Sequence, residues 1–425
     1  MSTPALLSVN MLSGYAQPGD TIFVPGGVTP PIAYLEALQQ DPAHSRGLHL
    51  VTSIAPGINN PLDPARLHDS ARVTGLFMQA GLNEAQRTGH YRMLPLSYGG
   101  FVRHLYEREP FDLCVLQVTP PDARGWCSLG PSVEFAPLAA RRSKRLLALI
   151  NPLLPRTPGS VEMPYETFDA ACDCPTDLPS YSTPSDASTR AIAQLIADRI
   201  ESGSTVQMGL GKVPTALAEA LLQHRGLRLQ SGLLSDGLMQ LAQAGALDPS
   251  HAPTACVLAG SDALYEWSLR PEGLGPQGLR LVGCEHSHDV AALAALPRFI
   301  AVNSALEVDL FGQCNLEHAD GRAISGAGGA PDFARAAKLS PDGCSIVALN
   351  ASGQRGTLSR IVAQLSSPSV ASLSRVDVDL VITEHGVADL RTASVHERAE
   401  ALIQIADPAF RPALRSAWFT LAQRL

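Results

Sequence analysis

The chain has 425 residues, a formal net charge of −8, a sequence pI near 5.8 and 45% hydrophobic residues. This length suits two domains of about 200 residues each, and the hydrophobic content is enough to bury a core in both. The acidic balance argues against nucleic acid or an anionic membrane as the main partner. The first residues lack a basic region, and no run of about 18 uncharged apolar residues occurs, so we expect neither a secretion signal nor a membrane span.

Cysteine usage gives little sign of a metal site. The eight cysteines are scattered, and only Cys172 and Cys174 lie close together. A C-x-C pair without a second pair or nearby histidines is a weak metal signal. We therefore expect no metal, reduced thiols and a cytoplasmic location.

The N-terminal half predicts buried strands that alternate with amphipathic helices. Apolar spacing at 32–40 predicts a helix, and the run before it ends in the tight glycine turn Gly26-Gly27. The apolar runs that predict strands lie at 21–27, 48–54, 111–121 and 145–155. This alternation predicts an α/β fold with mainly parallel sheets covered by helices.

A stretch without periodicity divides the chain. Residues 172–189 are rich in Pro, Ser and Thr, which predicts a linker. We expect an N-terminal α/β domain over 1–178, a linker over 179–189 and a C-terminal α/β domain over 190–425. Both halves contain a strand that runs into a glycine turn and a helix, so the two domains are expected to be related and to face one another across a cleft. In the second half a helix is predicted at 189–203, and strands at 205–211, 279–285, 299–312, 344–350 and 378–386.

The turn Gly209-Leu210-Gly211 joins a predicted strand to a helix that contains Pro214. Glycines let a ligand approach the backbone, and the amino end of the helix favours anionic groups. The third glycine of a dinucleotide fingerprint is missing, and no acidic residue ends the next strand, so a nicotinamide site is not expected. Taken alone, such a turn can also be purely structural.

A second glycine loop indicates a ligand site more specifically. Gly326, Gly328 and Gly329 precede Asp332 and Phe333, and the amides of such a loop can converge on an oxyanion or a phosphate. The alternative is a solvent-exposed loop with no ligand.

Acidic residues occur within two predicted strands or at their ends. Glu307 and Asp309 interrupt an apolar strand, so they are members of structural ion pairs or line a polar cleft. Glu384 and His385 follow another strand, where the histidine could act as a general base or the pair could hold a loop by hydrogen bonds. The chain has neither a G-x-S-x-G elbow nor a P-loop, which disfavours α/β-hydrolases and nucleotide triphosphatases.

Taken together and in order, these segments resemble the acetyl-CoA hydrolase/transferase family, which includes 4-hydroxybutyrate and butyrate–acetate CoA-transferases. The resemblance implies two CoA-transferase-type domains with the active-site cleft between them, acyl-CoA as substrate, a carboxylic acid acceptor, and a homodimer or larger assembly. The segments that carry it are VTPPDARGWCSLGPSVEF (118–135), INPLLPRTPG (150–159), VQMGLGKVP (206–214), LLSDG (233–237), NSALEVDLFGQ (303–313), SGAGGAPDF (325–333), SRIV (359–362) and VITEHGVADLR (381–391).

The family mechanism depends on a residue that this chain lacks. Family members typically read H-[ST]-E-[ML]-x-S-D-G, and their glutamate attacks the thioester, whereas this chain reads Q-S-G-L-L-S-D-G with Gly232 at that position. Asp236 lies in the retained S-D-G turn and keeps its family role. Histidine stands at 385 where tyrosine is usual, and at 286 and 288 where a Y-x-N-type sequence is common, so the resemblance does not fix the acyl group.

The resemblance assigns roles by position. The catalytic position is that of Gly232, with Asp236, Glu384 and His385. The residues implied for the oxyanion and for CoA are Gly209, Gly211, Pro214, Gly326, Gly328 and Gly329, and those implied for the substrate pocket are Gly26, Gly27 and Glu307.

A missing nucleophile leaves three hypotheses. In the first, a substrate carboxylate or water uses the space that Gly232 vacates and attacks the thioester directly, which gives transfer or hydrolysis without a glutamyl-CoA intermediate. In the second, the protein is a catalytically inactive CoA-binding or regulatory homologue. In the third, the same glycine turns hold a different small substrate without CoA. We favour the first, because the S-D-G turn and the G-x-G-G loop are retained.

Overall fold

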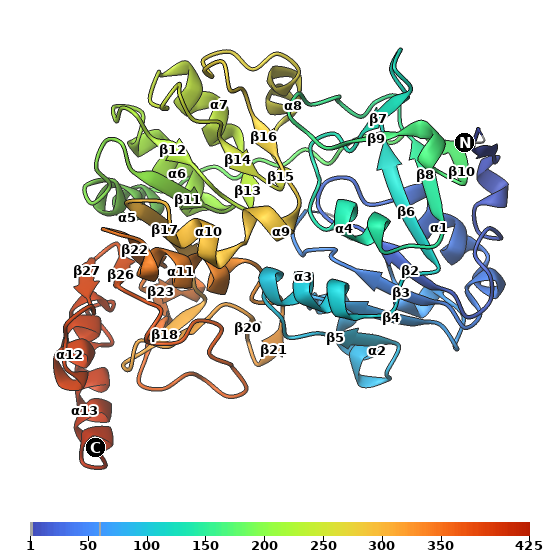
Figure 1. The fold of residues 1–425 in the computed structure, drawn as a ribbon. Coiled ribbons are helices and arrows are strands. Elements are labelled where there is room, and N and C mark those ends of the chain that lie inside the picture. The colour runs from blue at the N-terminus through green and yellow to red at the C-terminus, as the bar shows by residue number, and fades with distance from the viewer. Residues whose placement is uncertain (1–2, 59–60) are drawn as a thin grey trace. The chain divides into compact units, whose positions relative to one another are not determined.

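The computed structural model describes residues 3–58 and 61–425, which form two compact units (Figure 1). The first unit contains residues 1–182, 253–271 and 278–287, and the second contains 183–252, 272–277 and 288–425. The first crossing, at 182/183, lies inside the predicted linker. The later return of the chain to the first unit is not visible in the sequence pattern, because short polar crossings leave no change of composition.

The first unit is built on an eight-stranded sheet in which every neighbouring pair is parallel. Its order is β1 (Ala5–Leu6), β10 (Ala170–Asp173), β8 (Leu146–Ile150), β6 (Leu113–Val118), β2 (Thr21–Val24), β3 (His49–Thr52), β4 (Arg72–Gly75) and β5 (Tyr91–Met93). All six residues of β6 are buried, as expected of a central parallel strand. The four strands predicted in this half are confirmed as β2, β3, β6 and β8.

Helices and short strands complete the first unit. The predicted helix at 32–40 is confirmed as α1. The helices are α1 (Ile32–Gln40), α2 (Asn83–Arg87), α3 (Tyr98–Glu107), α4 (Ala136–Arg141), α8 (Asp262–Ser268) and α9 (Cys284–Ser287), and the remaining strands are β7 (Trp126–Ser128), β9 (Glu162–Pro164), β14 (Thr254–Ala255), β15 (Val257–Leu258) and β16 (Arg280–Leu281).

The second unit has a six-stranded sheet, parallel except for its last pair, β26 and β27. Its order is β12 (Arg228–Leu229), β11 (Thr205–Met208), β17 (Phe299–Ser304), β22 (Cys344–Ala348), β26 (Leu380–Thr383) and β27 (Gly386–Asp389). The predicted mainly parallel α/β fold is therefore confirmed in both units. The strands outside this sheet are β13 (Leu233–Leu234), β18 (Glu307–Asp309), β19 (Cys314–Asn315), β20 (His318–Ala319), β21 (Arg322–Ala323), β23 (Ser352–Gly353), β24 (Leu358–Ser359) and β25 (Ile361–Val362).

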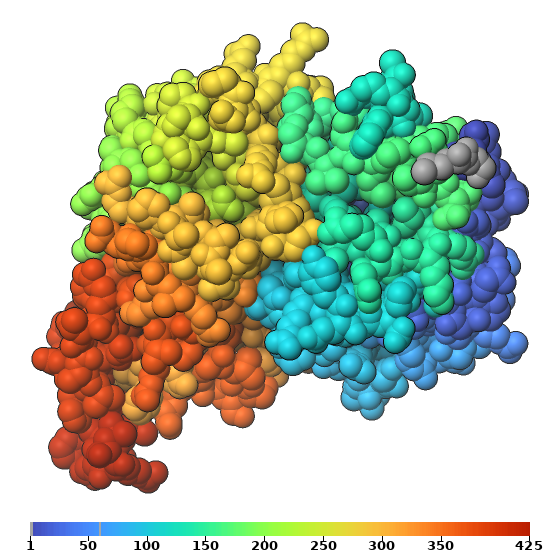
Figure 2. Space-filling view, viewed as in Figure 1, coloured from blue at the N-terminus to red at the C-terminus, as the bar shows by residue number. Residues whose placement is uncertain are grey.

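The last two helices of the second unit, α12 and α13, form the C-terminal segment of the chain, coloured red in Figure 2. Of the residues in α13, only Leu414 is buried, and Phe419 is 70% exposed. None of the helices in the described ranges is both long and apolar enough to cross a bilayer. The helices of this unit are α5 (Ala187–Ala197), α6 (Lys212–Ala220), α7 (Asp236–Gln243), α10 (Val290–Ala294), α11 (Ala330–Leu339), α12 (Val395–Ile405) and α13 (Arg411–Ala422).

Two local predictions need correction. The irregular segment is shorter than the predicted stretch 172–189, because β10 continues to Asp173 and α5 begins at Ala187. A capping box formed by Asp186 and Thr189 starts this helix earlier than the apolar spacing suggests. The strand predicted at 279–285 is only the two residues of β16, and Cys284 already belongs to α9.

Candidate active site

The turn that follows β11 lies at the carboxyl edge of the second unit's sheet. Gly211 has φ +123° and is the N-cap residue of α6, a backbone conformation that only glycine adopts easily. A side chain at Gly209 or Gly211 would meet no described atom within 4 Å. Pro214 is buried within α6. This turn therefore offers open backbone at a helix amino end, where an anionic group is favoured.

Gly232 lies next to this turn, between β12 and β13. The Ser231 hydroxyl is fully buried and donates to the Met208 carbonyl oxygen over 2.6 Å, which ties the segment to the end of β11. A Cβ atom at Gly232 would lie 2.9 Å from Nε2 and 3.1 Å from Cε1 of His288. The His288 ring therefore occupies part of the space beside Gly232, and direct attack by water or a substrate carboxylate at this position stays a prediction.

His288 also belongs to this site. In the sequence it stands out only as a departure from the family pattern. It precedes α10, is 2% exposed, and packs on Phe333 with ring centroids 4.7 Å apart. Burial lowers the pKa of His288 to about 3, so the ring is neutral at physiological pH. The sequence signal that could have revealed His288 is the paired substitution, because glycine at 232 and histidine at 288 both replace the usual family residues.

The second glycine loop meets the same imidazole. Gly326, Gly328 and Gly329 precede α11, Gly328 has φ +58°, and Gly329 is the N-cap residue of the helix. A Cβ atom at Gly329 would overlap Nε2 and Cδ2 of His288. The structure therefore brings Gly232 and Gly329 to the same histidine, beside the amino end of a ten-residue helix.

The predicted acidic residues are held in different ways. Asp236 lies in the first turn of α7, where a carboxylate suits the helix dipole. Glu307 accepts hydrogen bonds from the Ser366 backbone amide and hydroxyl, both over 2.9 Å. The carboxylate of Asp309, which is buried, accepts the Gln313 side-chain amide over 2.8 Å, and burial raises the pKa of Asp309. Neutral donors hold Glu307 and Asp309, which favours a structural role.

Glu384 and His385 form the two-residue turn between β26 and β27. Glu384 Oε2 accepts the Ala351 backbone amide over 2.8 Å, and Ala351 follows β22. The His385 amide donates to the Thr383 hydroxyl over 3.1 Å, while its side chain is exposed. Both residues lie at the carboxyl edge of the sheet, and the hydrogen bond of Glu384 anchors a neighbouring loop. Their catalytic role stays a prediction.

The first unit has its own glycine turn, Gly26-Gly27, at the carboxyl end of β2. The Gly26 amide donates to the Ser53 hydroxyl over 2.9 Å, and that hydroxyl donates to Glu134 Oε2 over 3.0 Å. Glu134 is 3% exposed and has φ +40°, an uncommon conformation for a residue with a side chain. Burial raises the pKa of Glu134 to about 7, opposed by these hydrogen bonds. In the sequence, the segment G-P-S-V-E-F (130–135) carries no pattern that marks this carboxylate as functional.

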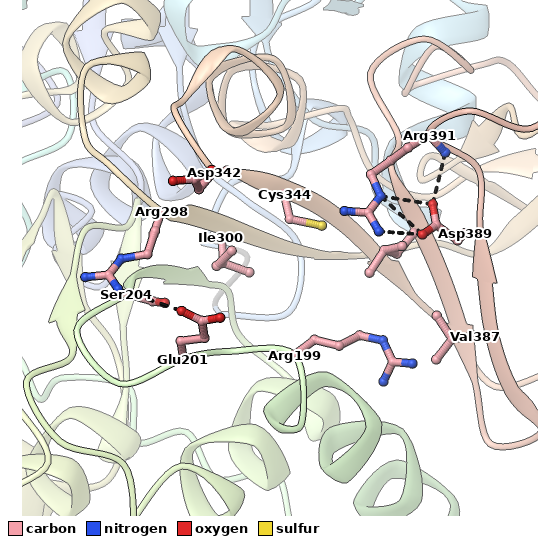
Figure 3. A pocket seen from close by; sticks show the side chains of 12 residues that line it. Arg199, Glu201, Ser204, Arg298, Ile300, Asp342, Cys344, Val387, Asp389 and Arg391 are labelled. Atoms are coloured by element: carbon pink, nitrogen blue, oxygen red, sulfur yellow. Dashed lines mark hydrogen bonds and ion pairs between the residues drawn. The ribbon is translucent and has the colours of Figure 1, made fainter.

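An open pocket lies at the opposite, amino edge of the second unit's sheet (Figure 3). Ser204, Arg298 and Gly343, which directly precede β11, β17 and β22, line it. Arg391 forms an ion pair with Asp389, and both side chains are about half exposed. None of the predicted site residues lines this pocket. It is a solvent-accessible charged hollow, separate from the glycine turns.

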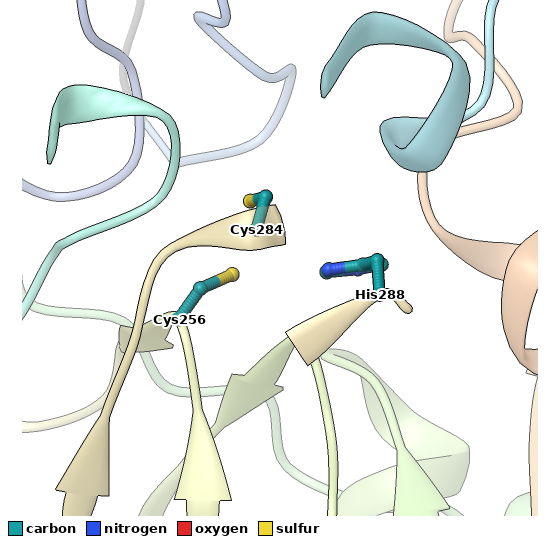
Figure 4. A group of neighbouring side chains, drawn as sticks. All are labelled: Cys256, Cys284 and His288. Atoms are coloured by element: carbon teal, nitrogen blue, oxygen red, sulfur yellow. The ribbon is translucent and has the colours of Figure 1, made fainter. Parts of the chain in front are cut away.

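Two buried cysteines of the first unit, Cys256 and Cys284, are drawn with His288 in Figure 4. Burial raises the pKa of the Cys284 thiol well above its ordinary value. Since His288 belongs to the second unit, no metal site is assigned to these side chains.

Comparisons with known proteins identify relatives of this chain. A model of the acetyl-CoA hydrolase/transferase C-terminal domain matches residues 260–418. The 4-hydroxybutyrate coenzyme A transferase of Clostridium kluyveri is 30% identical over 392 residues, which cover 90% of both chains. The succinyl-CoA:cyclohexane-1-carboxylate CoA transferase of Geobacter metallireducens is 31% identical over 353 residues, which cover 81% of this chain and 80% of the relative.

Solved structures confirm the fold. RipA from Yersinia pestis is similar with a TM-score of 0.88 and 24% identity, and the match covers 98% of both chains. A 4-hydroxybutyrate CoA-transferase from Porphyromonas gingivalis has a TM-score of 0.79 and 24% identity, covering 99% of this chain and 98% of the other. The sequence relatives confirm the predicted family: the chain belongs to the acetyl-CoA hydrolase/transferase family.

Proposed function

We propose that this protein is an enzyme that acts on an acyl-CoA thioester, by CoA transfer or by hydrolysis, without a covalent glutamyl-CoA intermediate. Family membership supports the substrate class, since relatives are named as CoA transferases and as acetyl-CoA hydrolases. One observation carries the mechanism: the glycine turns of the carboxyl edge are present, while position 232 has no carboxylate.

Without a carboxylate at position 232, the attacking oxygen in this proposal comes from water or from the acceptor acid. In hydrolysis, water attacks the carbonyl carbon, the carbon–sulfur bond breaks, and the water proton ends on the CoA thiolate. In transfer, the acceptor carboxylate attacks to give a mixed anhydride and a CoA thiolate, which then attacks the acceptor's carbonyl carbon and releases the first acid. Both routes pass through an oxyanion, which the amides of the glycine turns could stabilise by about 3–4 kcal/mol per donor.

The predicted residues receive roles within this proposal. Gly326, Gly328 and Gly329 would supply amides to the oxyanion, and Gly209 and Gly211 would accept an anionic group of CoA at the amino end of α6. Asp236, Glu384 and His385 are the proposed polar groups of the reaction, with Gly26, Gly27 and Glu307 in the substrate pocket.

A panel of acyl-CoAs, each offered with and without carboxylic acid acceptors, tests the proposal. Hydrolysis releases free thiol in the absence of an acceptor, whereas transfer changes the acyl group with no net release of thiol. Gly328→Ala, which forces a side chain into a left-handed conformation, should reduce turnover. The proposal fails if no acyl-CoA is turned over and neither acyl-CoA nor free CoA shifts the Tm.

A second candidate is a catalytically inactive acyl-CoA-binding homologue. The glycine at position 232 favours it, because the carboxylate that attacks the thioester in the family is missing there. This candidate predicts a Tm shift with acyl-CoA and no turnover across the whole panel. Borohydride reduction after incubation with acyl-CoA should leave residues 230–237 unmodified under both candidates, and an adduct there would contradict both.

A further inference from the structure

The imidazole of His288 lies in a slot whose walls are two glycines. Nε2 is 2.9 Å from the Cβ position of Gly232, well inside van der Waals contact, and the Cβ position of Gly329 overlaps the same ring edge. Because neither wall carries a side chain, a Cβ atom at either position would force the ring to shift.

Little room is left for this ring to move aside. Phe333 Cε2 lies 3.5 Å from the Cβ position of Gly232 and 3.1 Å from that of Gly329, so the phenyl ring closes the slot. Phe333 is 3% exposed and packs on Phe299 of β17, with ring centroids 6.4 Å apart. A side chain added at position 232 would therefore push a buried ring against a packed core rather than into solvent.

We propose that Gly232 and His288 are a matched pair that determines the reaction type of this protein. The His288 ring and a side chain at position 232 exclude one another, so the site cannot hold a carboxylate nucleophile at 232 while the ring is present. Gly232→Glu alone should therefore not restore the family's reaction, because the His288 ring remains in place. This inference rests on the proposed function for its chemistry, and on packing alone for the mutual exclusion.

The exclusion is tested by placing side chains at 232 with and without the ring. Asparagine at 288 lacks the Nε2 and Cε1 atoms that approach position 232 and keeps a polar group near Nδ1. The proteins compared are the wild type, Gly232→Ala, Gly232→Glu, His288→Asn and both double variants. Gly232→Ala adds only the Cβ atom and remains informative if Gly232→Glu does not fold.

We expect the changes in Tm caused by the substitutions at 232 and 288 to be non-additive. Gly232→Ala and Gly232→Glu in the wild-type background should lower the Tm by about 3–10 °C, as overpacking does in proteins of this size. In the His288→Asn background the same substitutions should change the Tm by less than about 2 °C, because the clashing atoms are absent. His286→Asn is the matched control: this histidine lies two residues earlier, is exposed, and should give no such relief.

The reaction type is read from covalent trapping. After incubation with acyl-CoA and borohydride, the Gly232→Glu/His288→Asn variant should carry an adduct at position 232 and show acid-dependent CoA transfer, whereas Gly232→Glu alone should show neither. Additive Tm changes, or an adduct on Gly232→Glu alone at unchanged Tm, would overturn the pairing. A double variant that regains its Tm but forms no adduct overturns the assignment of reaction type. Wild-type turnover on the acyl-CoA panel tests the proposed function separately.

Discussion

Each unit has a glycine turn at the carboxyl edge of its parallel sheet, and in each a buried titratable side chain lies at that edge. In the first unit, Glu134 is linked to the turn at Gly26 through Ser53. In the second, His288 lies against Gly232 and Gly329. Burial raises the pKa of Glu134 to about 7 and lowers that of His288 to about 3. Both shifts favour the uncharged form, as expected for groups removed from water.

The two edges nevertheless respond to pH in different ranges. His288 is neutral throughout the physiological range, so this imidazole adds no charge to the second unit's edge there. Glu134 is about half protonated near pH 7, so the charge of this carboxyl group changes under physiological conditions. The amino edge of the second unit contrasts with both, because its Arg391–Asp389 ion pair is about half exposed.

The largest expected effect is from Gly26→Ala. Its Cβ would overlap the Ser53 carbonyl oxygen and lie 2.7 Å from the Ile54 amide nitrogen. These are backbone atoms that follow β3, and they cannot yield without disturbing the pairing of β2 with β3. We expect a loss of about 3 kcal/mol or more in the free energy of unfolding, measured by urea titration. Gly81→Ala is the control, since its Cβ would meet open space. Equal stability of the two variants would contradict the close approach.

Glu134→Gln tests the pH behaviour of the first unit's edge. The folded pKa of about 7 lies above the unfolded value of roughly 4.3, so the folded state binds more protons between these values. The contribution of Glu134 to stability is therefore fully present below about pH 4 and is lost as pH rises through 7. Over this range the shift amounts to roughly 4 kcal/mol. The stability difference between variant and wild type should change by that amount between pH 4 and pH 9, and a constant difference would refute the shifted pKa.

The sequence predicts the strands and glycine turns well because they depend on local patterns. The apolar run before Gly26 and the turn at Gly209 leave plain signals, and both lie where expected at the carboxyl ends of strands. The slot around His288 leaves no such signal, since it joins residues 232, 288, 329 and 333 by packing alone. The sequence does not reveal Glu134 for the same reason, because its hydrogen-bond partner Ser53 is 81 residues away.

Gly329→Ala should have an intermediate effect, because its Cβ would meet the end of a side chain rather than backbone. The His288 ring would have to shift toward Phe333, which we expect to cost about 1–3 kcal/mol. Gly209→Ala at the same sheet edge adds a Cβ into open space and should change the free energy of unfolding by less than about 0.5 kcal/mol. Urea titration of both variants compares a filled and an open position. If Gly329→Ala is as stable as Gly209→Ala, the slot is looser than its distances indicate.

The smallest effect is expected at the amino edge, from Arg391→Gln. The Arg391 Nε donates to Asp389 Oδ1 over 3.0 Å, and hydrogen bonding from this guanidinium lowers the pKa of Asp389. Since both side chains are about half exposed, solvent screening should limit the loss of stability to less than about 1 kcal/mol, and added salt should reduce it further. Turnover should follow the wild type, because no residue proposed for the reaction lines this pocket. An Arg391→Gln variant that keeps its Tm but loses turnover would place the chemistry at the amino edge, since no packing change could then account for the loss.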